Sequence, residues 1–148
     1  MKKNYAILFA FFFCSIFLNA QNEAAKFAFF QGEPLDLSTN GHNAVIIGEA
    51  TSTSDRYSNP DMALGLKGGF VSVEDTPALK ITDQITISVW VYIPSSFALD
   101  NWIGIVNKWA GSGGYYLGIN PDNLRVRWNC FVANIEDPQS IATDTWMH

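Results

Sequence analysis

Aromatic and basic side chains are concentrated between residues 102 and 128, and side chains of these types commonly bind sugars. Aromatic rings stack on the C–H faces of sugar rings, and polar side chains fix the hydroxyl groups. The alternative is that the large aromatic side chains fill the core between two sheets while the arginines lie on a solvent face. The candidate ligand-binding residues are Trp102, Trp109, Tyr115, Tyr116, Arg125 and Trp128.

Oxygen-bearing side chains recur at every second position in the segment that begins at Asp36. Asp36, Ser38 and Asn40 precede the turn-forming Gly41, as at the start of an EF-hand loop, and calcium prefers oxygen ligands. An EF-hand itself is excluded because Ile47 stands at the twelfth position, where that motif requires glutamate. We expect a structural calcium ion held by the three side chains together with backbone carbonyls and remote carboxylates. The alternative is an Asx-type turn, in which Asp36 and Asn40 bond the backbone.

Side chains for hydrolytic catalysis are sparse. Retaining glycosidases need two carboxylates close together, but no two acidic residues are separated by a single residue. The adjacent acidic pairs at 74–75 and 136–137 would point to opposite sides of a strand. The two histidines, His42 and His148, do not favour a Ser-His-Asp triad. These observations favour binding over catalysis.

Residues 1–20 have the pattern of a secretory signal peptide. Two lysines precede an apolar stretch from Tyr5 to Leu18, and the small residue Ala20 precedes a polar segment. The apolar stretch is shorter than the roughly 20 residues that a transmembrane helix needs. We expect cleavage after Ala20 and export to the periplasm, the cell surface or the medium. Residues 21–148 would then form one domain without a transmembrane segment, and Cys130 would be its single cysteine, which excludes an internal disulfide.

The composition indicates an acidic all-β domain that does not bind nucleic acid. The net charge is -5, and the 9 lysines and arginines never form a basic run. Residues 85–93 alternate strictly between two faces, and residues 124–129 do the same after a turn signal at 120–123. The second of these strands should form a hairpin with residues 115–119. Further strands are expected at 44–47, 63–66, 70–73 and 103–108. Short strands without intervening helices predict an antiparallel β-sandwich or jelly roll.

Five motifs occur in an order that resembles the laminin-G-like jelly-roll domains of the concanavalin A-like lectin/glucanase superfamily. The resemblance covers roughly residues 27–148, and two departures from the family pattern are Asn40 and Leu66. Family members carry Trp-x-His well before their end, so we expect further strands after His148 and an incomplete sandwich here. The family often binds a structural calcium ion. The motifs are the segments 36–43, 55–60, 63–68, 85–91 and 146–148.

The resemblance implies a secreted, non-catalytic binding or adhesion module for a carbohydrate or another cell-surface ligand, such as a protein. The superfamily also contains glycoside hydrolases, but their acidic signature Glu-x-Asp-x-x-Glu is absent from this sequence. A second hypothesis is therefore a glycan-processing enzyme whose catalytic residues lie beyond His148. A third is a non-functional remnant that does not fold into a soluble protein.

Overall fold

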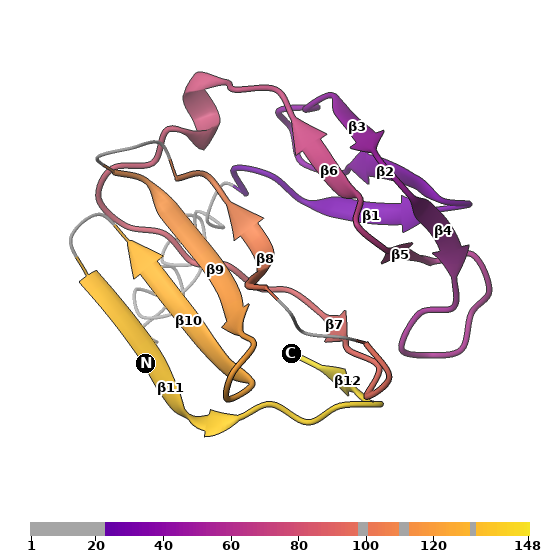
Figure 1. The fold of residues 1–148 in the computed structure, drawn as a ribbon. Coiled ribbons are helices and arrows are strands. Elements are labelled where there is room, and N and C mark those ends of the chain that lie inside the picture. Colours follow the sequence, from indigo (N-terminus) through magenta and orange to yellow (C-terminus); the bar gives the residue numbers. More distant parts are fainter. Residues whose placement is uncertain (1–22, 98–100, 110–112, 131–132) are drawn as a thin grey trace, which may run out of the picture.

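The computed structural model describes residues 23–97, 101–109, 113–130 and 133–148. In these ranges the chain is built of antiparallel strands, and the helical element described is the short 3-10 turn η1 (Pro77–Leu79). The predicted all-β, antiparallel fold class is therefore confirmed, and the arrangement is compatible with a β-sandwich. Strands β1 to β6 lie on one side of the molecule, and strands β8 to β11 lie on the other (Figure 1).

The largest sheet has four strands in the order β11-β10-β9-β8. Its centre is the hairpin predicted from the sequence, in which Val126 pairs with Ile119 and Trp128 pairs with Leu117. The side chain of Asn120 accepts a hydrogen bond from the backbone N–H of Asp122 at 3.0 Å, which closes the turn. The strands are β8 (Ile103–Asn107), β9 (Tyr115–Asn120), β10 (Arg125–Cys130) and β11 (Ala133–Ser140).

The remaining strands form two-stranded ladders. The predicted strands at 44–47, 63–66 and 70–73 are confirmed with the same bounds. Strands β1, β2, β4 and β11 were not predicted, because a proline or few apolar side chains obscure the alternation in most of them. The ladders pair β1 (Phe27–Phe30) with β2 (Glu33–Asp36), β3 (Ala44–Ile47) with β6 (Phe70–Val73), β4 (Ala50–Thr53) with β5 (Ala63–Leu66), and β7 (Val91–Tyr92) with β12 (Trp146–Met147).

The strand predicted at 85–93 is only partly formed. Its side chains alternate as expected, from the half-buried Ile85 and Ile87 on one face to the exposed Trp90 on the other. However, only β7, at Val91–Tyr92, has ladder partners among the described residues. Alternation fixes which way side chains point, whereas a ladder also needs a neighbouring strand, and β12 supplies only two residues.

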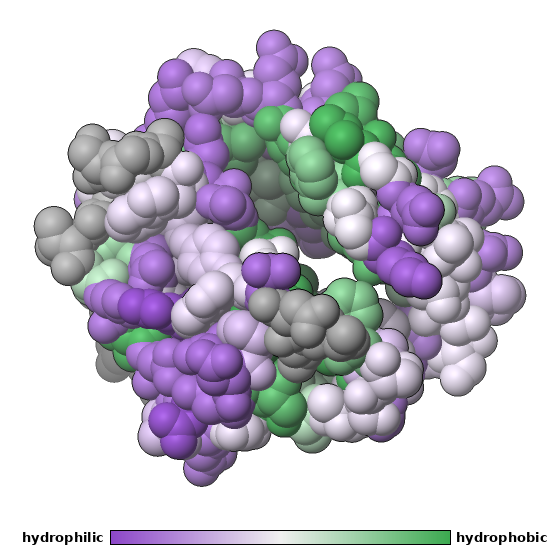
Figure 2. All heavy atoms as spheres, in the orientation of Figure 1, coloured by the Kyte–Doolittle hydropathy of each residue, from purple (hydrophilic) through white to green (hydrophobic). Residues whose placement is uncertain are grey.

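The core lies on one face of the four-stranded sheet. Ile119 is fully buried, and Tyr115 is 5% exposed while its hydroxyl donates a hydrogen bond to the backbone carbonyl of Leu79 at 3.1 Å. Ile93 and Ala63 are buried as well. Figure 2 shows apolar side chains gathered around the central opening of the molecule and hydrophilic ones around the rim. Because Tyr115 and Ile119 share the core face of β9, Tyr116 and Gly118 point to the opposite face of the sheet.

The predicted signal peptide at residues 1–20 lies outside the described residues. Within the described part of the chain, no helix has the length and hydropathy needed to cross a membrane.

Candidate functional site

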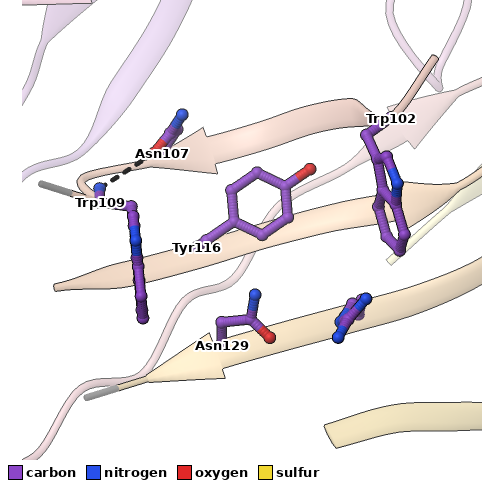
Figure 3. A pocket seen from close by; sticks show the side chains of 6 residues that line it. Trp102, Asn107, Trp109, Tyr116 and Asn129 are labelled. Carbon is purple, nitrogen blue, oxygen red and sulfur yellow. Dashed lines mark hydrogen bonds between the residues drawn. The ribbon is translucent and has the colours of Figure 1, made fainter. Parts of the chain in front are cut away.

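A hollow of about 350 Å³ lies on the face of the four-stranded sheet that points away from the core. Strands β8, β9 and β10 form its floor, and the segments just before and just after β8 supply its two ends (Figure 3). Its lining combines three aromatic residues with three polar residues. They are Trp102, Asn107, Trp109, Tyr116, Arg127 and Asn129.

Strand register places the floor residues side by side. Asn107 on β8 and Asn129 on β10 both pair with Tyr116 on β9, which forms one row across the sheet. In the next row Gly104 and Arg127 both pair with Gly118. Residues that pair directly on neighbouring strands point to the same face, so the floor presents a phenol ring, two carboxamides and a guanidinium to one ligand.

The ring of Tyr116 lies flat on the sheet. A Cβ atom built at Gly118 would overlap the hydroxyl and the ring of Tyr116, so the ring occupies the space that any larger residue at position 118 would need. At Gly104 a Cβ atom would lie 3.5 Å from the ring, in ordinary contact. Figure 3 shows the ring with its face turned toward the viewer and out of the sheet. A flat, outward-facing ring is a stacking platform.

The Tyr116 hydroxyl stays protonated at neutral pH. Burial raises the pKa of Tyr116, and the nearby positive charge of Arg127 only partly opposes that rise. The hydroxyl donates a long hydrogen bond of 3.4 Å to the carbonyl of Ile103. Tyr116 therefore offers a neutral phenol at the floor of the hollow, with a weakly engaged hydroxyl.

Two tryptophans lie at opposite ends of the Tyr116 platform. Trp102 and Trp109 stand on either side of Tyr116 (Figure 3), and each is 43% exposed. The backbone N–H of Trp109 donates to the side-chain oxygen of Asn107 at 3.0 Å, which fixes the chain where it leaves β8. The guanidinium carbon of Arg127 lies 5.1 Å from the centre of the Trp102 ring, within the range of a cation–π contact.

The polar side chains of the floor keep binding capacity. The Asn129 side-chain oxygen is buried and has no hydrogen-bond partner among the described residues. A buried unpaired carboxamide oxygen is costly. Because this oxygen has no accessible surface, a ligand hydroxyl satisfies it only when the Asn129 side chain turns toward the hollow. Arg127 donates from Nε to the side-chain oxygen of Asn134 at 2.7 Å, which orients the guanidinium.

The six ligand-binding residues predicted from the sequence do not share one surface. Trp102, Trp109 and Tyr116 meet in the hollow. Arg125 lies on the same face but outside the hollow, 4.0 Å from the carboxylate of Glu136. Tyr115 and Trp128 lie on the core face of the sheet, because each alternates with a residue of the hollow along its strand.

Three residues of the hollow were not predicted, namely Asn107, Arg127 and Asn129. The sequence held a signal for two of them, because alternation in residues 124–129 groups Arg125, Arg127 and Asn129 on one face. Asn107 had no comparable signal, since its position depends on pairing with Tyr116.

The lining contains no carboxylate. Glu136 faces the same side from β11, where it pairs with Arg127. Hydrogen bonds from the side chains of Asn123 and Asn120, at 2.9 and 3.3 Å, hold the pKa of Glu136 below its usual value, although burial opposes this. A general acid for glycoside hydrolysis needs a raised pKa, so Glu136 is not suited to that role.

The residues of the predicted calcium site do not fit a cation. The Asp36 carboxylate accepts hydrogen bonds from the backbone N–H groups of Lys26, Ser38 and His42 and from the Ser38 hydroxyl, at 2.8 to 2.9 Å. Burial acts to raise the pKa of Asp36, but these hydrogen bonds hold it well below its usual range. Asn40 donates from its side chain to the carbonyl of Ala24 at 3.0 Å.

Donors therefore surround the carboxylate on both oxygens, whereas a bound cation would require those lone pairs for itself. Among the described residues no group of three or more histidine, cysteine, aspartate or glutamate side chains is placed to hold a metal ion. The geometry of the loop favours the alternative, an Asx-type turn that joins β2 to the segments on either side.

Comparison with protein-family models, with curated proteins and with solved structures gives no match for this chain.

Proposed function

We propose that this chain is an exported, non-catalytic module with a laminin-G-like jelly-roll fold, and that it binds a glycan in the hollow on β8, β9 and β10. The single observation that carries the proposal is the flat Tyr116 ring between Trp102 and Trp109. Aromatic faces held open to solvent suit the apolar C–H surfaces of sugars. The unpaired oxygen of Asn129 beside this ring suits a sugar hydroxyl.

The exposure of Trp102 and Trp109 leaves both rings accessible to a ligand. Tryptophan side chains that fill a core lose most of their contact with water, whereas Trp102 and Trp109 each keep 43% of theirs. The open shape of the hollow between two ring walls suits a chain of sugars lying across the sheet. The export proposed from residues 1–20 would place the hollow where extracellular glycans occur.

Binding also fits the hollow better than hydrolysis does. Glu136, the carboxylate opposite Arg127, is engaged by two asparagines and has a lowered pKa. We propose no calcium ion at Asp36, because that carboxylate is saturated with hydrogen-bond donors. A cell-surface protein remains the competing partner class, and the experiment below separates it from a glycan.

The test is binding of the full chain to an array of purified glycans and to insoluble polysaccharides. The wild type should bind at least one glycan, and the double variant Trp102→Ala, Trp109→Ala should lose that binding. The matched control is Trp90→Ala, because Trp90 is also 43% exposed but lies outside the hollow. Equal binding by the double variant and the wild type would overturn the assignment of the hollow. Binding to a cell-surface protein but to no glycan would overturn the ligand class.

A further inference from the structure

Arg127 is the one charged residue among the six that line the hollow. Glu136 lies opposite it on β11, and the Arg127 charge contributes to the lowered pKa of Glu136, but the two side chains form no ion pair. Among the described lysines and arginines, Lys26, Lys80, Lys108 and Arg125 each have a carboxylate oxygen within 4.0 Å, whereas Arg56, Lys67 and Arg127 do not. No described carboxylate lies that close to Arg127. What distinguishes Arg127 from Arg56 and Lys67 is its place in the lining of the hollow.

The guanidinium of Arg127 is held in a defined orientation. Its Nε donates to Asn134 on β11, and its plane lies near the Trp102 ring, 5.1 Å from the ring centre. The two terminal nitrogens have no hydrogen-bond partner among the described residues. They remain available to an acceptor in the hollow, and a guanidinium can bind a carboxylate through two parallel hydrogen bonds.

Resting on the proposed function, we infer that the glycan carries carboxylate groups, so that the ligand is a chain containing uronic acid. One sugar ring stacks on Tyr116, and the carboxylate of the same or the adjacent residue accepts hydrogen bonds from Arg127. Asn129 lies two residues from Arg127 on the same face of β10, next to Tyr116, and it binds a hydroxyl of the stacked sugar. Arg127 then acts as a specificity residue.

The experiment compares uronic acid polymers with their carboxyl-reduced forms, which keep the backbone and lose the charge. The probes are polygalacturonate, alginate, glucuronoxylan and hyaluronan, each in native and reduced form, with dextran sulfate as a sulfated polymer. Calorimetric titration of the full chain should show at least one native polymer bound about tenfold more tightly than its reduced form, as expected for a charge-assisted hydrogen bond.

Variants at Arg127 test the residue itself. Arg127→Gln should remove the preference for the native polymer. Arg127→Lys should keep part of it, because lysine retains the positive charge but cannot make the two parallel hydrogen bonds of a guanidinium. The matched control is Arg56→Gln, which removes a cation that also lies over tryptophan, 4.6 Å from the Trp90 ring, but outside the hollow. If Arg127→Gln does not fold, the comparison of native and reduced polymers on the wild type still tests whether the ligand carboxylate is recognised.

The outcomes separate this inference from the proposed function. Equal affinity for native and reduced polymers would overturn the inference that the ligand carries a carboxylate, while the proposal of glycan binding would stand. Binding of dextran sulfate without any uronic acid polymer would overturn it as well. Failure to bind any polymer here or any neutral glycan on the array would overturn the proposed function together with the inference.

Discussion

The phenol ring of Tyr116 lies over Gly118, the next residue but one on strand β9, and there is no room for a Cβ atom beneath it. Residues two apart on a strand share a face, so a side chain at position 118 would compete with the ring for the same place. The flat platform thus depends on a missing side chain as much as on the aromatic one.

The change Gly118→Ala should lift the Tyr116 ring off the sheet and weaken glycan binding about fivefold, since an aromatic contact contributes about 1 kcal/mol. Titration with a glycan that the wild type binds measures the effect. The control is Gly104→Ala, whose added methyl would only touch the ring at 3.5 Å and should leave the affinity unchanged. Unchanged binding by Gly118→Ala would show that the flat ring is not part of the site.

Two neighbouring tyrosines should separate stability from binding. Tyr115 lies in the core and donates a hydrogen bond to Leu79, so Tyr115→Phe should lower the free energy of unfolding by about 1 kcal/mol without changing glycan affinity. Tyr116→Ala should weaken glycan binding and change the free energy of unfolding less. Chemical denaturation and glycan titration of both variants check this, and a loss of affinity in Tyr115→Phe would place the binding surface on the wrong side of the sheet.

The Asp36 turn should stabilise the fold without calcium. Asp36→Asn should lower the free energy of unfolding by about 2 kcal/mol at neutral pH, because one acceptor oxygen becomes an amide nitrogen. Either the His42 N–H and the Ser38 hydroxyl lose their shared acceptor, or the N–H groups of Lys26 and Ser38 lose theirs. The pKa of Asp36 is lowered in the folded chain, so its contribution is present above the unfolded pKa of about 3.9 and is lost as the pH falls below it. The difference between variant and wild type should therefore shrink below about pH 4.

Thermal unfolding in calcium and in chelator, repeated across this pH range, measures both effects. The midpoint of the wild type should be the same in the two buffers. A midpoint that calcium raises in the wild type, but not in Asp36→Asn, would restore the calcium site expected from the spacing of Asp36, Ser38 and Asn40.

Backbone amides in the segment 85–90 should exchange with solvent faster than those of β9 and β10. Their side chains alternate in exposure, but no ladder pairs them within the described residues. Hydrogen exchange followed by mass spectrometry tests this, since unpaired amides are protected only weakly. Protection equal to that of β9 would mean that the segment is paired as a full strand, as the sequence pattern predicted.

Sequence patterns were sufficient for the strands whose apolar residues alternate between clear turn signals. The hairpin of β9 and β10 follows from such a pattern, as do β3, β5, β6 and β8. The segment 85–93 shows the limit of this reasoning. Alternation determines to which side of a strand each side chain points, but it does not show whether a partner strand lies beside it. Strand β11 shows another limit, since seven of its eight residues are exposed and it contains a proline.

The site could be predicted only in part. Period-two alternation already separates Tyr115 from Tyr116 and Trp128 from Arg125, so a single ligand surface could not have held all four. The sequence does not reveal which face of the sheet the core covers. It also does not reveal that Trp102 and Trp109 lie on either side of the Tyr116 ring. The Asp36 loop was ambiguous for a physical reason, because a metal loop and an Asx turn place oxygen atoms at the same spacing and differ in where the backbone N–H groups point.

The most direct test of a glycan site on β8, β9 and β10 is nuclear magnetic resonance of the labelled chain during titration with a bound glycan. We predict that the indole N–H signals of Trp102 and Trp109 and the side-chain amide signal of Asn129 will shift, while the indole signals of Trp90 and Trp128 will not. Shifts confined to Trp90 or to the Asp36 loop would contradict the account, because they would place the ligand away from the Tyr116 platform.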